Sequence, residues 1–183
     1  LTLAGLVRRI LAETPVERIR LSSIEPQHVD DEMLAAWVDG APRTLPHVHL
    51  PLQSGDDGVL RRMGRRYVAD DYARLVEWVR SAIPGVAVHA DVIAGFPTED
   101  DRAFESTMSA VAAVGITKVH VFPYSPRPGT RTAADDPVAS EVKKERSARL
   151  RVASDAACVA RWSRRVGSDD VVLVDRPGLG FDR

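Results

Sequence analysis

Polar and charged residues stand at the ends of four short apolar runs of this sequence, together with small residues and turn formers. The residues at these four ends are Ser22, Ser23 and Glu25, then Gln53 and Ser54, then Asp91, Ile93 and Gly95, and finally Phe122, Pro123 and Tyr124. If the runs are parallel strands, their carboxyl ends meet at one edge, which is where βα-barrel proteins bind ligands. The pattern therefore predicts a ligand site with several convergent polar groups.

Each of these residues also has a purely structural explanation. Polar groups often cap strand ends, so Ser22 and Ser23 could simply bond to local backbone. Gly95 either serves a tight turn alone, or its missing Cβ lets a ligand approach the chain. Asp91 lies inside an apolar run, where a carboxylate is costly unless it is paired or faces a ligand. The repetition on four consecutive runs, rather than any single residue, favours the binding site.

Other chemistries find less support in the sequence. His47 and His49 point to one face of a strand, and with His89 and His120 they suggest a metal, but no Asp or Glu stands at metal-ligand spacing. Cys158 lies in the middle of a helical stretch, where an inert thiol is the usual case. The motifs G-x-S-x-G, G-x-G-x-x-G and the phosphate-binding P-loop are missing, which argues against hydrolase and Rossmann functions.

Two basic segments are candidate contacts for nucleic acid. The chain has a formal net charge of −1, yet residues 141–165 hold eight basic residues against three acidic ones. That helix either faces nucleic acid or is an ordinary solvated face. The run Arg61–Arg66 places arginines four residues apart on a predicted helix that Gly64 weakens, and arginine suits phosphate contacts. A structural role for these arginines is the alternative.

Helical and strand patterns alternate along the chain. Helices are expected over 2–13, from the cap Asp30 to Gly40, over 70–83, from a capping box at Thr98 and Asp101 to Gly115, and over 140–165. Asp56 and Asp57 suit the start of a further short helix. Strands are expected over 18–25, 46–52, 86–93 and 118–122, with a last one over 171–175.

This alternation predicts an α/β fold with a partial, TIM-like (β/α) barrel, because 183 residues are too few for eight units of roughly 25 residues or more. We expect the barrel over 1–166 and the start of another, β-rich domain over 167–183. Both ends of the chain look cut, so a fragment is expected. No apolar run reaches membrane length and no signal peptide is visible, and the single cysteine excludes an internal disulfide. A cytoplasmic location without membrane contact is therefore expected.

Three segments give a more specific indication. HVHLPLQSGDDGVLRRMGRRY, DVIAGFPTEDDRAF and VHVFPYSPRPGT, in this order, resemble the radical-SAM methylthiotransferases. RLSSIEP resembles the branch that acts on threonylcarbamoyladenosine in tRNA, and VVLVDRPGLG resembles the entry to the small TRAM-like β-barrel RNA-binding domain of this family. The resemblance implies barrel strands three to six.

The resemblance also implies a reaction. In this family a [4Fe–4S] cluster reduces S-adenosylmethionine to a radical that takes hydrogen from C2 of a modified adenosine in the anticodon loop of tRNA. A second cluster helps to deliver sulfur, another S-adenosylmethionine supplies the methyl group, and a donor such as flavodoxin or ferredoxin supplies electrons. The Cys-x3-Cys-x2-Cys motif of the family is missing here, so no cluster is ligated by this chain and the chain alone is expected to be inactive. The alternatives are a methylthiotransferase for isopentenyladenosine in tRNA or for a ribosomal protein, or a non-catalytic barrel or RNA-binding fragment.

Matching positions imply individual roles. Residues expected to contact S-adenosylmethionine are Ser22, Ser23, Glu25, Gln53, Ser54, Asp91, Ile93, Gly95, Phe122, Pro123 and Tyr124. Residues expected near the substrate or RNA are His49, Arg61, Arg65, Arg127 and Thr130. Thr98 replaces the usual glycine of the family before Glu99, a departure within the motif that follows Asp91.

Overall fold

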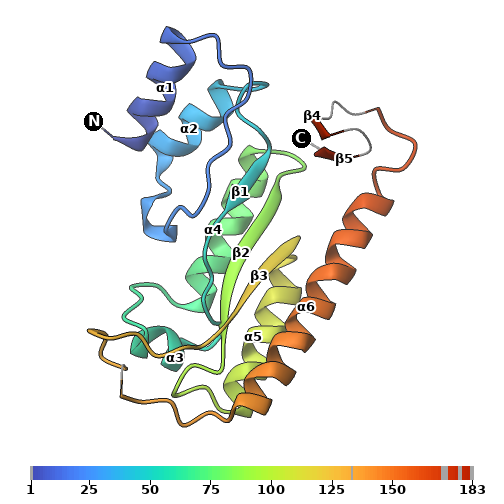
Figure 1. The fold of residues 1–183 in the computed structure, drawn as a ribbon. Coiled ribbons are helices and arrows are strands. Elements are labelled where there is room, and N and C mark those ends of the chain that lie inside the picture. Colours follow the sequence, from blue (N-terminus) through green and yellow to red (C-terminus); the bar gives the residue numbers. More distant parts are fainter. Residues whose placement is uncertain (1, 133, 170–172, 177–178, 182–183) are drawn as a thin grey trace.

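A computed structural model describes residues 2–132, 134–169, 173–176 and 179–181. The chain alternates helices with three parallel strands and ends in a short hairpin (Figure 1). In order the elements are α1 (Leu3–Glu13), a 3-10 turn (Pro26–His28), α2 (Asp31–Asp39), β1 (His47–His49), α3 (Asp57–Arg62), α4 (Ala69–Ala82), β2 (Ala87–Ala94), α5 (Asp101–Val114), β3 (Lys118–Pro123), α6 (Ser140–Ser163), β4 (Leu173–Arg176) and β5 (Leu179–Phe181).

The three strands form a parallel sheet in the order β1-β2-β3. His49 pairs with His89, and Asp91 pairs with His120, so the strands are in register from their amino ends. β1 is short, but the chain after it stays beside β2, because the Gln53 amide donates to Asp91 O (2.7 Å) and Ile93 donates back to Gln53 O (3.0 Å). The prediction of a partial parallel α/β sheet is confirmed.

The prediction of a regular strand over residues 18–25 is wrong. The segment 18–25 is extended, but it meets the sheet only through an isolated bridge between Ile19 and Thr44 and through the Ile24 amide, which donates to His49 O (3.0 Å). The partner Thr44 lies in a turn region just before β1, where the backbone is not yet straight. The segment therefore follows the edge of the sheet without continuous pairing.

Local capping explains most helix boundaries. Asp30 accepts from the Met33 amide at the start of α2, and Asp56 accepts from Val59 at the start of α3, as expected. The expected capping box at Thr98 is wrong, because Asp100 is the N-cap of α5 and accepts from the Ala103 amide. Gly115 closes α5 in the left-handed conformation, with φ 66°.

The arginine run does not form one helical face. α3 ends at Arg62, and Gly64 follows in a left-handed conformation with φ 78°. Arg65 and Arg66 therefore lie beyond the helix, and the predicted pairing of arginines four residues apart is wrong. A glycine is needed at this turn because a Cβ makes positive φ costly.

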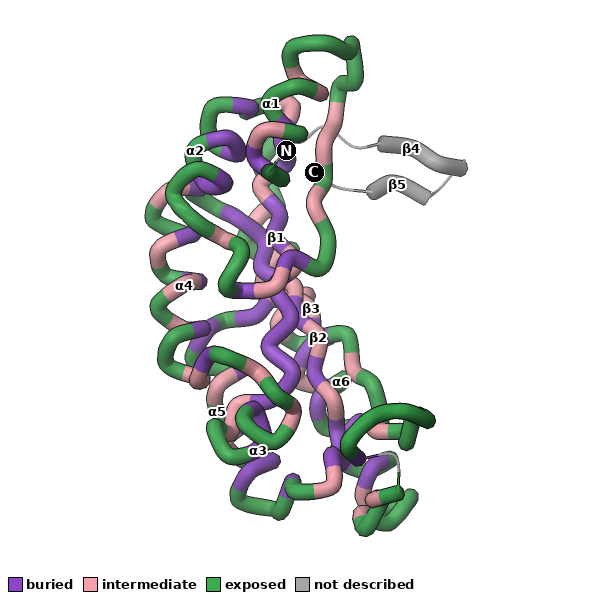
Figure 2. Tube along the Cα trace, turned by 90° about the vertical axis from the view of Figure 1, so that its left-hand side faces the viewer, coloured by how far each residue is buried: buried purple, intermediate pink, exposed green. Residues whose placement is uncertain are grey.

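Buried and partly buried residues alternate along β2 (Figure 2). Residues that point to the outer face are buried in one apolar core with side chains of α4, α5 and α6. These sheet residues are Val48, Leu50, Val88, Ala90, Val92, Ala94 and Val119. Alternate residues on β2 and β3, such as His89, Asp91 and His120, remain partly or largely exposed. The sheet thus packs its helices on one side and keeps a polar inner side.

The C-terminal prediction is met only in part. β4 and β5 form an antiparallel pair, so β structure begins near the expected position, although residues 171 and 172 of the expected strand lie outside the described part. Two short strands do not make a barrel, and the division at residue 166 stays a prediction.

Candidate functional site

A cavity of about 760 Å³ lies at the carboxyl ends of the three strands. It is bounded by the end of β2, by β3 and the loop that follows it, and by the turn after α3. Its lining residues are Gln53, Arg62, Met63, Gly64, Arg65, Asp91, Ile93, Phe96, Phe122, Pro123, Tyr124, Ser125, Arg127, Thr130, Arg131 and Thr132. Nine of these were expected from the sequence as cofactor or substrate residues. We name it the strand-end cavity.

Gln53 is positioned by an unusual backbone conformation. Its φ is 68°, a left-handed value that is uncommon for a residue other than glycine. Its backbone amide and carbonyl both form hydrogen bonds with β2. Its side-chain amide makes no hydrogen bond within the described part of the chain. The residue is only 8% exposed. A side-chain amide without a protein partner at a cavity wall is well placed to bond a ligand.

Asp91, which lines the cavity, forms a polar pair with His49 on the inner face of the sheet. His49 Nε2 lies 2.8 Å from Asp91 Oδ1, and both side chains are largely buried. This contact offsets the cost of a carboxylate on an apolar strand. Ser23 stands 3.5 Å from His49 Nδ1 and also has a positive φ, 55°. Two strained residues, Ser23 and Gln53, therefore flank the same polar pair.

Aromatic residues form the far wall of the cavity. Phe122 is 52% exposed there, near the carboxyl end of β3, a strand in which only Val119 is buried. Tyr124 packs edge-on against Phe96 with ring centroids 5.3 Å apart, and its hydroxyl donates to Thr132 O (2.8 Å). This bond folds the loop after β3 over the cavity. An exposed ring beside polar groups suits a purine or another flat ligand.

Arg65 and Glu25 connect the first expected strand to the cavity. Arg65 Nη1 lies 2.7 Å from Glu25 Oε1, and Arg65 also lines the cavity wall. Its Nε is buried without a partner within the described residues. Glu25 is therefore tied to the site through Arg65, while Ser22 is exposed and does not line the cavity.

Ser54 lies away from the cavity, although it directly follows Gln53. Its hydroxyl is fully buried 3.2 Å from Thr107 Oγ1 of α5, and it accepts from the Asp56 amide. The next residue, Gly55, touches α5 so closely that a Cβ would lie 2.6 Å from Thr107 Cα. Through these contacts Ser54 helps to pack the sheet against α5.

Gly95 also meets protein rather than open space. Its φ is 77°, and a Cβ there would lie 2.5 Å from Cγ of Lys143 on α6. Lys143 pairs with Asp136 and lies 5.3 Å from the Tyr124 ring centroid. The missing Cβ thus leaves room for the aliphatic part of the Lys143 side chain. Gly95 affects the cavity only indirectly, through the loop that begins at this residue.

Glu99 is a residue that the sequence did not single out. Its carboxylate accepts from the Gly95 amide (2.7 Å) and from Arg146 (2.9 Å), and its side chain is fully buried. Burial raises the pKa of Glu99, although the Gly95 amide and Arg146 act in the opposite direction. The pair holds the loop after β2 against α6. The sequence did contain a signal for this role. Glu99 stands four residues after Gly95 at the end of a strand, and arginines that could pair with it stand on a later helix.

Most ordered charges of α6 are used in packing. Arg146 also bonds Asp101, and Arg149 pairs with Glu105 of α5. Two arginines of the basic run over 141–165, Arg146 and Arg149, therefore form a seam with α5 and its loop. This favours the structural alternative for that helix.

Histidines fill the inner face toward the amino ends of the strands. The rings of His47 and His89 lie 4.3 Å apart, and those of His49 and His120 lie 5.0 Å apart. Burial lowers the pKa of His47 to about 3 and that of His89 to about 4. The pKa of His120 is also lowered by burial. In the part of the chain that the structure describes, no group of three metal-ligating side chains has a geometry that would hold a metal.

Comparison with known proteins shows which family has this architecture. Over residues 2–111 the chain matches the family model described as the radical SAM superfamily. The chain belongs to the radical SAM superfamily. Coproporphyrinogen III oxidase from Escherichia coli shares the fold, with a TM-score of 0.60, 16% identity, and coverage of 91% of this chain and 39% of that one. The methyltransferase TsrM from Kitasatospora setae, with cobalamin and a [4Fe-4S] cluster bound, aligns over 66% of this chain and 24% of its own with a TM-score of 0.53 and 19% identity.

A curated relative is more similar in sequence. The tRNA-2-methylthio-N(6)-dimethylallyladenosine synthase of Erythrobacter litoralis (strain HTCC2594) is 38% identical over 179 residues. The match covers 97% of this chain, which spans 40% of the length of that relative. Its name specifies the isopentenyladenosine alternative, not the threonylcarbamoyladenosine branch. None of the helices in the described ranges combines the length and apolar character of a membrane span.

The residues present do not fit an iron–sulfur cluster. Such clusters need several thiolates, and the chain has one cysteine. Cys158 lies on α6, where its thiol donates to Thr117 O (3.1 Å), just before the amino end of β3. The strand-end cavity lies at the opposite end of the strands. The cavity does fit the organic cofactor of the superfamily, because an amide without a protein partner, a carboxylate and aromatic rings share its wall.

Proposed function

We propose that this chain is the cofactor- and substrate-binding part of a tRNA methylthiotransferase. The strand-end cavity carries the proposal, because it gathers nine of the residues expected at this site in a chain that resembles a methylthio-adenosine synthase along nearly its whole length. When bound, S-adenosylmethionine supplies the radical and methyl chemistry of this superfamily. The cluster ligands, the electron donor and the RNA-binding barrel expected from residue 167 onward belong to the same proposal for the whole protein.

The cavity residues orient the cofactor and the target base. The side-chain amide of Gln53, which follows β1, forms hydrogen bonds with polar groups of the cofactor. The Asp91 carboxylate, fixed by His49, accepts from an ammonium or a ribose hydroxyl. Phe122, Pro123 and Tyr124 cover a flat ring and keep water from one of its faces. Proximity and exclusion of water are the contributions of this chain to the reaction.

Threonylcarbamoyladenosine is the substrate we propose first. Its threonyl group ends in a carboxylate, and four arginines line the cavity, namely Arg62, Arg65, Arg127 and Arg131. Arg65 is balanced by Glu25, and Arg62 lies 3.5 Å from Asp135, which leaves Arg127 and Arg131 to meet an anion. An apolar dimethylallyl group would bond none of them. Dimethylallyladenosine is the second candidate, favoured by the name of the 38% identical relative.

Mass spectrometry of tRNA nucleosides distinguishes these possibilities. Deleting the gene should remove the methylthio group from threonylcarbamoyladenosine, and the full-length gene should restore it. Loss of the methylthio group from the dimethylallyl nucleoside alone would assign the second substrate. An unchanged nucleoside profile would refute tRNA methylthiolation and leave a non-catalytic or protein-directed role.

A further inference from the structure

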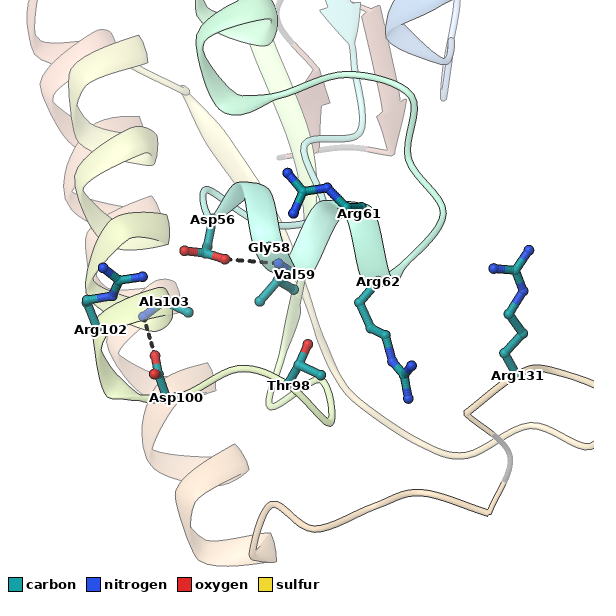
Figure 3. A pocket seen from close by; sticks show the side chains of 10 residues that line it. All are labelled: Asp56, Gly58, Val59, Arg61, Arg62, Thr98, Asp100, Arg102, Ala103 and Arg131. Atoms are coloured by element: carbon teal, nitrogen blue, oxygen red, sulfur yellow. Dashed lines mark hydrogen bonds between the residues drawn. The ribbon is translucent and has the colours of Figure 1, made fainter.

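A second cavity of about 580 Å³ lies beside the strand-end cavity, between α3 and the start of α5 (Figure 3). Its lining residues are Asp56, Gly58, Val59, Arg61, Arg62, Thr98, Asp100, Arg102, Ala103 and Arg131. Four of the ten are arginines, and two are aspartates. We name it the arginine cavity.

The two aspartates are already occupied as helix caps. Asp56 accepts from the Val59 amide (2.9 Å), and Asp100 accepts from the Ala103 amide (2.7 Å). Arg61, Arg102 and Arg131 are exposed and form no ion pair with described residues. The lining still has a net positive charge, because four guanidinium groups outnumber the two capping carboxylates, which stay anionic.

The four arginines do not converge on one point. Figure 3 shows Arg102 on the α5 side, Arg62 and Arg131 on the opposite side, and Arg61 on α3 between the two sides, pointing away from Thr98. A single small anion could contact only one or two of them. An extended polyanion that runs through the cavity could meet each in turn.

The arginine cavity is continuous with the proposed reaction site. Arg62 and Arg131 line both cavities, so they mark the passage from one to the other. A nucleotide bound in the strand-end cavity carries a phosphate on each side of its ribose. The RNA backbone on either side of this nucleotide must leave the cavity along a positively charged path. The passage at Arg62 and Arg131 is such a path.

We propose that the arginine cavity binds the phosphodiester backbone of tRNA next to the modified nucleotide. Arg131 meets the nearest phosphate, and Arg61 and Arg102 meet the phosphates that follow. Arg62, which lies 3.5 Å from Asp135, marks the passage. Guanidinium groups match phosphate oxygens in a planar fork, and such contacts fix the register of RNA without reading its sequence. The proposal rests on the proposed tRNA substrate, and it sets Arg62, Arg102 and Arg131 beside the expected Arg61.

The test uses the full-length protein and a synthetic anticodon stem–loop RNA. The variant pair R61Q and R102Q, combined in one protein, alters only the arginine cavity, because neither residue lines the strand-end cavity. The matched control combines R151Q and R164Q, which remove the same charge from exposed arginines on α6 and at its C-terminal end. RNA affinity is measured by fluorescence anisotropy over a series of salt concentrations, and turnover is measured at saturating RNA.

We expect the R61Q/R102Q protein to lose about 10-fold in affinity and its slope of log affinity against log salt to fall by about one for each arginine removed. The lysine pair R61K/R102K recovers most of the affinity, because lysine keeps the positive charge. The control protein should bind like the wild type. An unchanged thermal unfolding temperature excludes misfolding as the cause.

The failures of the two proposals look different. If wild-type protein methylthiolates tRNA but R61Q/R102Q binds with unchanged affinity and slope, the arginine cavity proposal is overturned while the function stands. An equal loss in the control would also overturn it, because general charge would then explain the effect. Unchanged RNA binding with slower reduction by an acidic electron-donor protein would overturn it in favour of protein docking. If wild-type protein modifies no tRNA, the proposed function itself fails.

Discussion

The outer and inner faces of one three-stranded sheet differ in what their side chains do. On the outer face, Leu50 and Val88 are completely buried under helices. On the inner face, the neighbouring residues His89 and Asp91 stay partly exposed, and His49 is paired with a carboxylate. The strand period of two separates these roles most clearly along β2, where buried and partly exposed residues alternate.

The difference shows where stability and function are located. The outer face gains free energy by removing apolar area from water, and any loss of volume there is felt directly. The inner face accepts polar side chains and strained backbone at Ser23 and Gln53, and these costs are met by the packing behind them. Substitutions should therefore affect stability on one face and binding on the other.

Breaking the buried ion pair behind the cavity should have the largest effect on stability. Replacing Arg146 with methionine leaves the buried Glu99 without its charged partner, which costs about 3–5 kcal/mol. The double variant E99Q/R146M should recover part of this loss, because no unpaired charge then remains. Chemical denaturation of the full-length protein measures both. A loss below about 1 kcal/mol for R146M would mean that the pair does not hold the loop after β2 to α6.

Substitutions on opposite faces of the sheet provide the next contrast. L50A opens a cavity in the core and should cost about 2–5 kcal/mol. H120A removes an exposed inner-face ring and should change the free energy of unfolding by less than about 0.5 kcal/mol. Equal losses in denaturant titrations would contradict the separation of the two faces.

The buried histidines should make stability depend on pH. Burial lowers the pKa of His47 to about 3 and that of His89 to about 4, whereas the unfolded chain takes up these protons near pH 6.5. The stability that they contribute is complete above about pH 6.5 and is lost as pH falls through that range toward about 4. H89N should flatten the fall of the unfolding temperature with pH. An identical pH dependence in the variant would show that His89 is not buried as a neutral ring.

Much of the fold could be predicted because its signals are local. Asp30 and Gly115 end helices through bonds to nearby backbone, and the apolar runs of β2 and β3 are long enough to be recognised alone. The segment from Arg18 to Glu25 could not be assigned correctly, because its apolar pattern is that of a strand but regular pairing depends on a distant partner. The cap of α5 was misplaced since Thr98 and Asp100 are both good capping residues.

The site could be predicted in position but not in detail. The alternation of side chains ends at Gln53, where a positive φ turns the chain, so sequence spacing could not show that Ser54 would face α5. Gly95 was expected to make room, but only the packing of α6 shows that Lys143 fills it. The role of Glu99 depends on Arg146, which lies 47 residues away.

Gln53 and Ser54 give the most direct test, because they are adjacent in sequence and separate in space. In the full-length protein, Q53A should lower the affinity for S-adenosylmethionine about 10-fold and leave the unfolding temperature unchanged, since its amide has no protein partner to lose. S54A should cost about 1–2 kcal/mol of stability through Thr107 and leave that affinity unchanged. Equilibrium binding of the labelled cofactor decides between them. Unchanged affinity in Q53A, or an equal loss in S54A, would contradict the placement of the cofactor in the strand-end cavity.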